Sequence, residues 1–135
     1  MIEYNVEHNL EVEEFREVLI NSTLANRRPI DNHDTLRKMV EMGNLTITAR
    51  HKGKLIGVSR SLTDFSFCTY LSDLAVDLSY QKRGIGKELI KRTKMEAPDA
   101  KLILLAAPEA ISYYPKIGMA QYEHCFYLDR AEDLI

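Results

Sequence analysis

Apolar residues recur along the chain at two different spacings, and the change of spacing divides it into predicted elements. In the first part they recur every three or four residues, which predicts helices over about 10–22 and around 36–40. Between 45 and 76 apolar and polar residues alternate, which is typical of half-buried strands, and 52–54 supplies a turn. We therefore expect an antiparallel meander of three strands in the middle of the chain.

The remaining apolar segments predict the outer parts of the fold. They are a first strand at 2–6, an amphipathic helix at about 84–96, a continuously apolar strand at 101–106 buried on both faces, a short helix near 109–114 and a last strand at 120–128. A helix that joins two strands of one sheet makes them parallel neighbours, so 66–76 should pair with 101–106. The order β-α-α-β-β-β-α-β-α-β predicts an α/β (α+β) fold, with a central mixed, mostly antiparallel sheet and flanking helices.

Length and charge restrict the kind of protein. The 135 residues suit a single domain, 1–135, and 45% apolar with 28% charged residues is ordinary for a globular protein. The net charge of -2, from 18 basic and 20 acidic residues, argues against a nucleic-acid partner. A local basic cluster could still hold one small anion.

The sequence contains no signal for a metal site, for secretion or for a membrane span. Cys68 and Cys125 lack zinc-ligand spacing, so we predict no metal site and two reduced thiols. The N-terminus lacks the basic stretch and apolar core of a signal peptide, and the apolar run 102–107 is far shorter than the ~20 residues that span a bilayer. We expect a cytoplasmic protein with no membrane partner.

The segment Gln81–Lys87 is the candidate for chemistry, because it lies between a predicted strand and a predicted helix. The first amides of a helix have no internal partner, and the helix dipole makes this end attractive to anions. Gly84 and Gly86 let these amides approach a bulky phosphate, and Lys82, Arg83 and Lys87 add positive charge. A dinucleotide fingerprint fails at Leu89, and a P-loop fails at Gln81 and Glu88.

Two motifs remain. Gln81-x-x-Gly84-x-Gly86, preceded by Leu74-Ala75-Val76-Asp77, resembles the coenzyme A signature of the GNAT superfamily of N-acetyltransferases. The segment 110–119, Ala-Ile-Ser-Tyr-Tyr-Pro-Lys-Ile-Gly-Met, is similar to a second motif of that superfamily. The order of predicted elements is also similar over nearly the whole chain. The resemblance therefore implies a GNAT-like fold and acetyl-CoA as co-substrate.

The resemblance also implies roles for individual residues. The backbone of Leu74, Ala75 and Val76 would hold the pantetheine arm, and an amide near Val76 could stabilise developing negative charge. The backbone amides that would bind the pyrophosphate belong to Gln81, Lys82, Arg83, Gly84, Ile85, Gly86 and Lys87. Tyr114 would be catalytic, protonating the departing thiolate; packing of a helix tyrosine on the last strand is its alternative role.

Other assignments stay open at this point. Asp73, Glu109, Glu123 and His124 are all conceivable general bases. The loop with Arg27, Arg28 and Asp31 would border the acceptor site, although solvation and helix capping explain these residues equally well. The chain departs from the family pattern at 107–109, where coenzyme contacts would lie, and at Pro115, which predicts a short or kinked helix at Tyr114.

We therefore predict an acetyl-CoA-dependent N-acetyltransferase that acts on a primary amine of a small molecule or peptide. The alternatives are a non-catalytic acyl-CoA-binding or regulatory module, and a nucleotide or nucleic-acid binder that uses the basic helix. The acceptor cannot be read from one sequence, because loops determine it. A homodimer is possible, without a distinct interface signal.

Overall fold

A computed structural model describes all residues, 1–135, and divides the chain into two compact units, 1–105 and 106–135. The first unit contains the sheet and the long helices. Its elements are β1 (Ile2–Val6), α1 (Val12–Asn21), α2 (His33–Met42), β2 (Leu45–His51), β3 (Lys54–Thr63), β4 (Cys68–Val76), α3 (Ile85–Glu96) and β5 (Lys101–Ile103). The second unit contains α4 (Tyr113–Lys116) and two short 3-10 turns. The single domain predicted over 1–135 stays a prediction.

The five strands of the first unit form one sheet in the order β1-β2-β3-β4-β5. Every neighbouring pair is antiparallel except β4 and β5, which are parallel. The predicted meander and the parallel pair across α3 are therefore confirmed, as is the fold class. No helix has the length and apolar character that a bilayer span requires.

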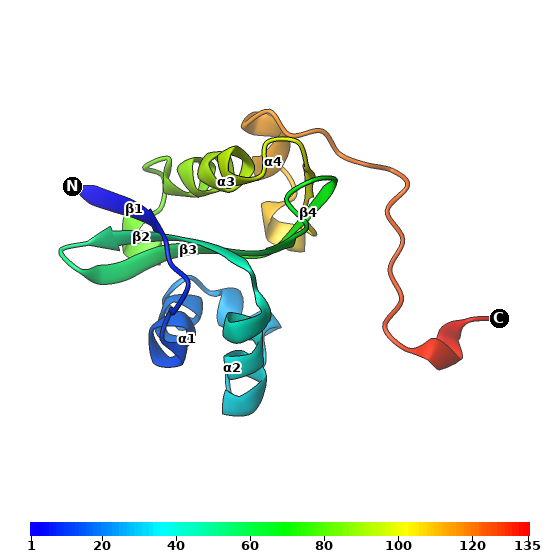
Figure 1. Cartoon of the computed structure of the whole chain (residues 1–135), viewed down its shortest axis with the longest axis horizontal. Coiled ribbons are helices and arrows are strands. Elements are labelled where there is room, and N and C mark those ends of the chain that lie inside the picture. Colours follow the sequence, from blue (N-terminus) through cyan, green and yellow to red (C-terminus); the bar gives the residue numbers. More distant parts are fainter. The chain divides into compact units, whose positions relative to one another are not determined.

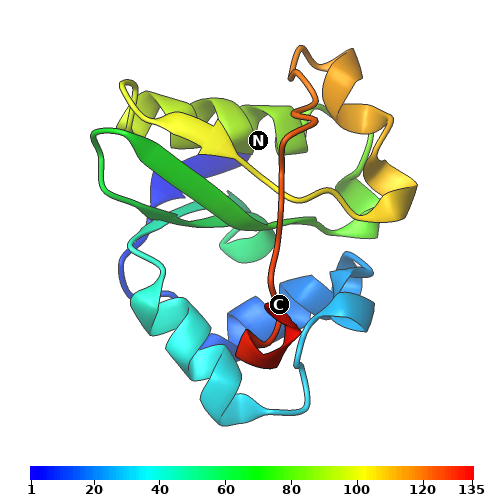
Figure 2. The ribbon, with the colours of Figure 1, turned by 90° about the vertical axis from the view of Figure 1, so that its right-hand side faces the viewer.

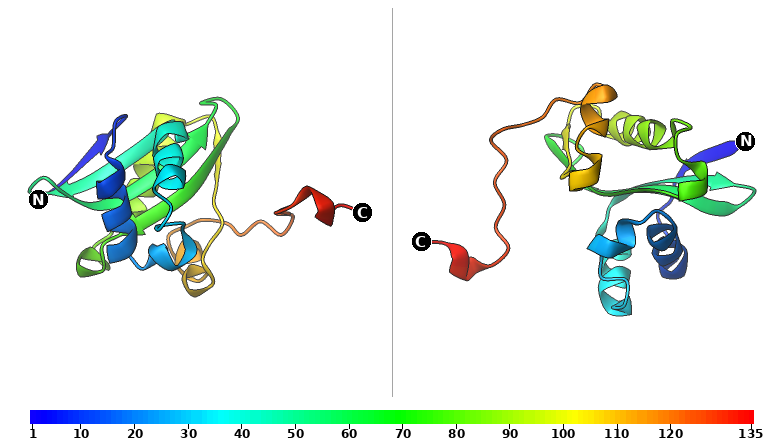
Figure 3. Two further views of the ribbon diagram at one scale, coloured as in Figure 1. Left: turned by 90° about the horizontal axis from the view of Figure 1, so that it is seen from below. Right: turned by 180° about the vertical axis from the view of Figure 1, so that it is seen from behind.

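Helices cover both faces of this sheet, with α1 and α2 on one side and α3 on the other (Figure 1; Figure 2). Phe15, Leu36 and Val58 belong to the core under α1 and α2, and they are fully buried. Ile56 and Leu89 belong to the separate core under α3. The two further views show the same three layers (Figure 3). The spacing of apolar residues in each helix thus identified the face that packs on the sheet.

Strand β4 contains an irregularity beside Ser72. Asp73 lies opposite Arg60 and Leu71 lies opposite Ser61, so Ser72 has no partner in β3. One extra residue in a strand reverses which face the following side chains occupy. Asp73 and Ala75 consequently face α1 and α2, whereas Leu74 and Val76 pack toward α3.

The C-terminal predictions need correction. No strand forms within 120–128, and the strand predicted at 101–106 is only Lys101–Ile103. It is not buried on both faces either, because Ile103 is 49% exposed. Alternating apolar residues become a strand only when a neighbour completes the ladder and buries one face, and Phe126 and Tyr127 remain largely exposed.

Candidate active site

The turn that follows β4 is fixed by its own hydrogen bonds. The backbone amide of Asp77 donates to the Ile56 carbonyl in β3 at 2.8 Å, which holds the end of β4 in the sheet. The Asp77 carboxylate accepts from the Ser79 amide at 2.8 Å and caps a 3-10 turn, Leu78–Tyr80. The Gln81 side-chain amide donates back to the Val76 carbonyl at 3.1 Å. Gln81 therefore ties the predicted coenzyme-binding turn to the strand before it.

Gly84 places the turn at the start of α3. Its φ is +79°, in the left-handed region, and a β-carbon added there would meet no atom within 4 Å. The glycine is thus required by the backbone conformation and not by lack of space. No side chain caps the N-terminus of α3. The amides after Gly84, including that of Gly86, therefore start a helix whose N-terminal donors are available to an anion.

Positive charge surrounds this helix start. Lys82, Arg83 and Lys87 are all exposed, and none of them forms an ion pair. The Arg83 guanidinium lies over the Tyr80 ring, 5.2 Å from its centre. The Tyr80 hydroxyl in turn makes a 2.7 Å hydrogen bond with His51 Nδ1, at the end of β2.

Tyr80 and His51 were not among the predicted site residues. No local pattern in the sequence marks them, because His51 lies 29 positions before Tyr80 and contacts it only across the sheet. An aromatic ring under a guanidinium restricts where that cation can go. Tyr80 therefore orients Arg83 beside the helix start.

One edge of β4 is open next to this turn. β5 pairs with β4 only at Cys68, Thr69 and Tyr70, so the six residues from Leu71 to Val76 have no strand partner on the β5 side. Leu74, Ala75 and Val76 lie in this open section, immediately before the turn. An unpaired strand edge offers alternating amide and carbonyl groups to any extended chain placed alongside it.

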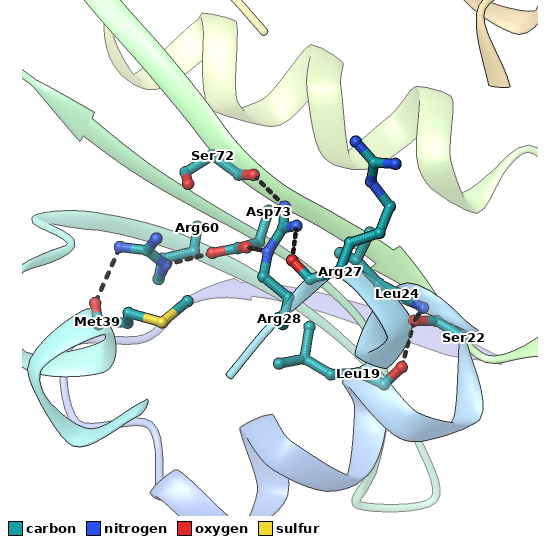
Figure 4. Close-up of polar contacts among 9 residues, drawn as sticks. All are labelled: Leu19, Ser22, Leu24, Arg27, Arg28, Met39, Arg60, Ser72 and Asp73. Carbon is teal, nitrogen blue, oxygen red and sulfur yellow. Dashed lines mark hydrogen bonds and ion pairs between the residues drawn. The ribbon is translucent and has the colours of Figure 1, made fainter. Parts of the chain in front are cut away.

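A buried ion cluster holds the loop between α1 and α2 against β4 (Figure 4). The Asp73 side chain is fully buried, and each of its oxygens accepts from a different arginine, Arg28 Nε or Arg60 Nε. The Arg28 Nη2 also donates to the Ser72 carbonyl at 2.8 Å, at the irregularity of β4. The Arg60 Nη1 donates to the Met39 carbonyl of α2 at 3.0 Å.

This cluster decides one of the open assignments. A general base needs a free oxygen within reach of the proton that it removes. Both oxygens of Asp73 are engaged and buried, so Asp73 is a structural anion and not the base. The other three conceivable bases, Glu109, Glu123 and His124, lie in the second unit and are exposed.

Tyr114 also lies in the second unit, within α4. Its ring makes an edge-on contact with Tyr113, with ring centres 5.2 Å apart. Burial, and then the neighbouring Tyr113, raise the pKa of Tyr114 above its usual value. The phenol therefore keeps its proton near neutral pH, as an acid must. α4 spans only four residues and contains Pro115, so the predicted helix is short.

A family model described as an acetyltransferase (GNAT) domain matches residues 7–129. Histone acetyltransferase TAP1 from Glycine max is 32% identical over 68 residues, 48% of this chain and 29% of that protein. GCN5-related N-acetyltransferase 2, chloroplastic, from Arabidopsis thaliana is 31% identical over 68 residues, 48% of this chain and 26% of that protein. The matched segment thus spans less than a third of either relative.

Solved structures share the fold. A GNAT family acetyltransferase from Streptococcus pneumoniae gives a TM-score of 0.76 at 17% identity, covering 96% of this chain and 99% of that chain. The aminoglycoside N-acetyltransferase AAC(6')-Iy, in a complex with CoA, gives a TM-score of 0.74 at 15% identity, covering 97% and 95%. At such identities the likeness concerns the fold alone.

Proposed function

This chain belongs to the GNAT family of N-acetyltransferases, which use acetyl-CoA to acetylate amines, and from that premise we propose the reaction that it catalyses. It transfers the acetyl group of acetyl-CoA to a primary amine of a small molecule or peptide by direct attack of the amine on the thioester. The observation that carries the proposal is the open edge of β4, which leads directly into a helix start with free amides and three exposed cations.

These residues suit the parts of acetyl-CoA. The pantetheine arm is an extended chain with amide groups, and the backbone of Leu74 to Val76 has matching groups without a strand partner. The pyrophosphate is a dianion, and the amides of 81–87 together with Lys82, Arg83 and Lys87 would neutralise it. When bound, acetyl-CoA supplies an acetyl group activated as a thioester.

The chain contributes orientation, charge stabilisation and one proton. A backbone amide near Val76, at the end of the open edge, would donate to the thioester oxygen as negative charge develops there. The Tyr114 hydroxyl would give its proton to the departing sulfur, and its raised pKa keeps that proton in place until then. The proton that the attacking amine loses would pass to water, from which the phenol regains its own. A thiol has a pKa near 8.5 and is an easier leaving group than an alcohol, so this acid is helpful and not essential.

The direct test is binding followed by turnover. Thermal unfolding of the whole chain with saturating acetyl-CoA should show a higher midpoint than without it. Release of the free thiol of CoA, followed across a panel of primary amines, should then require both acetyl-CoA and an amine. Absence of any acetyl-CoA binding would contradict the proposal. Binding without thiol release across the panel would favour a non-catalytic acyl-CoA-binding or regulatory module.

The role of Tyr114 is tested by Tyr114→Phe. This substitution removes only the hydroxyl, so kcat should fall by about tenfold while the KM for acetyl-CoA stays within about twofold. Tyr113→Phe is the matched control, because it removes a hydroxyl from the adjacent ring of the same helix. If the two variants lose equal amounts of kcat, Tyr114 is not the acid. In the wild-type chain, the Tyr114 hydroxyl should stay protonated up to at least about pH 10. Its ionisation should therefore cause no decline in rate below that pH.

A further inference from the structure

The cluster of Arg28, Arg60 and Asp73 leaves positive charge beside β4. Two guanidinium groups share a single carboxylate, so one unit of positive charge remains uncompensated. Arg28 binds the Ser72 carbonyl, which lies two residues before Leu74. At ~3.3 Å per strand residue, this point is about 7 Å along the strand from the section proposed to hold the pantetheine arm. The positive charge therefore adjoins the section of β4 that is proposed to hold the pantetheine arm.

Arg28 keeps hydrogen-bonding capacity on its outer side. A guanidinium has five N–H donors, and here three of them are engaged, with Asp73, the Ser72 carbonyl and the Arg27 carbonyl. Its side chain is 20% exposed, whereas that of Arg60 is 7% exposed. Arg28 can thus accept a further anionic partner without losing its present contacts, and Arg60 is enclosed.

Arg27 adds a second cation next to Arg28. It ends the 3-10 turn Leu24–Arg27, and its backbone carbonyl is held by the Arg28 guanidinium at 2.8 Å. Its own side chain is exposed, forms no ion pair, and extends away from Asp73 (Figure 4). Asp31, further along the same loop, pairs with neither arginine. Arg28 therefore anchors the loop to β4, while the Arg27 guanidinium stays free of ion pairs.

We propose that Arg27 and the outer side of Arg28 form a binding site for a carboxylate carried by the acceptor amine. The inference rests on the proposed acetyl transfer and names the class of acceptor. A planar guanidinium with free N–H groups matches the two oxygens of a carboxylate. The ion cluster fixes the loop at β4, so the bound carboxylate would be held at a defined distance from the attacking amine.

The proposal distinguishes this chain from proteins that share its family or its fold. One relative is by name a histone acetyltransferase, and one structural neighbour is by name an aminoglycoside N-acetyltransferase. Lysine-rich peptides and aminoglycosides carry several ammonium groups, which two arginines would repel. Polycationic acceptors should accordingly be poor substrates here.

The test compares pairs of amines that differ only in the carboxylate. 4-Aminobutyrate is paired with butylamine, and 6-aminohexanoate with hexylamine, because the amines within each pair have similar basicity. Initial rates of CoA thiol release are measured with the whole chain at saturating acetyl-CoA. We expect kcat/KM to be about tenfold higher for the carboxylate member of each pair, and this preference to decrease as salt is raised.

Arg27→Gln should remove the preference. Its kcat/KM should fall about tenfold for the carboxylate amine and less than twofold for the alkylamine, with the KM for acetyl-CoA unchanged. Arg27→Lys should retain part of the preference, since it keeps the charge but not the planar fork. Lys38→Gln is the matched control, because Lys38 is another exposed, unpaired cation, on α2. Lys38→Gln should leave kcat/KM unchanged for both the carboxylate amine and the alkylamine.

Several results would overturn the inference. One is thiol release without preference for the carboxylate amines, or with preference for polycationic ones. Another is an Arg27→Gln variant whose kcat/KM falls equally for both amines of a pair. A third is an Arg27→Gln variant with a higher KM for acetyl-CoA, which would make Arg27 a coenzyme contact. In these cases acetyl transfer still stands. If acetyl-CoA binds but no amine is acetylated, the proposed function fails and this inference fails with it.

Discussion

The turn after β4 and the ion cluster before it use charged residues in opposite ways. In the turn, Lys82, Arg83 and Lys87 are exposed and unpaired, and hydrogen bonds of the backbone and of Asp77 and Gln81 fix the chain. In the cluster, the charges themselves fix the chain, and its carboxylate is fully buried.

The cluster includes Asp73, within the open section of β4, and the turn follows the end of that strand. A buried carboxylate must be paired, so Asp73, Arg60 and the inner side of Arg28 are committed to structure. An exposed cation next to free helix amides has no such commitment and is available to a ligand. Charge near this site therefore indicates ligand binding only where the structure leaves it unpaired.

The largest loss of stability is expected when the buried Asp73 carboxylate loses its charge. Asp73→Asn keeps the shape of the side chain but leaves Arg28 and Arg60 without a counter-ion, which should lower the free energy of unfolding by about 3–5 kcal/mol. Urea denaturation of the variant and the wild-type chain measures the difference. Glu41→Gln is the control, since it breaks the exposed pair with Arg37 and should cost less than about 1 kcal/mol. Equal losses would show that the cluster is not what anchors the loop.

A smaller effect is expected from Gly84→Ala. The added methyl group meets no neighbour within 4 Å, so the cost arises from the left-handed backbone and should be about 1–2 kcal/mol of unfolding free energy. Gly53→Ala, in the turn between β2 and β3, has nearly the same φ, +81°, and the same open space, so its cost should be similar. Only Gly84→Ala should weaken acetyl-CoA binding, by about fivefold in titration calorimetry. If both variants bind acetyl-CoA as the wild-type chain does, the helix start does not hold the pyrophosphate.

The smallest effect is expected from removing the ring under Arg83. Tyr80→Leu should raise the KM for acetyl-CoA by about two- to fivefold with kcat unchanged, because a cation held over a ring at an exposed site is stabilised by about 0.5–1 kcal/mol. Tyr80→Phe keeps the ring and loses only the hydrogen bond to His51, so its increase should be smaller.

Tyr4→Leu is the matched control for the ring. It removes the tyrosine under Arg92, with 4.6 Å between the guanidinium and the ring centre, at a different position on α3. The KM for acetyl-CoA should be unaffected in this variant. An equal rise in KM for Tyr4→Leu and Tyr80→Leu would mean that the change acts through α3 as a whole and not through the orientation of Arg83.

Local sequence determined much of the first unit. Spacing of apolar residues defined α1 and α3 to within about two residues and located α2, since one helix face must be buried whatever its partner is. Gly84 and the cations around it marked the helix start for the same reason: a left-handed residue and an uncapped helix end are properties of a few consecutive residues. The fold class followed from the order of the predicted elements and the family from the resemblance of two motifs, and both are confirmed.

Tertiary structure decided the features that join distant residues. The pairing of β4 with β5 over only three residues left the open edge, and no local pattern gives the length of a ladder. The same holds for the missing strand at 120–128, because its alternation needed a neighbour to become a strand. Asp73 changed from a conceivable base to a structural anion only because residues 45 and 13 positions away reach its two oxygens. A sequence lists its charged residues, but which of them are paired and which are free depends on contacts formed across the fold.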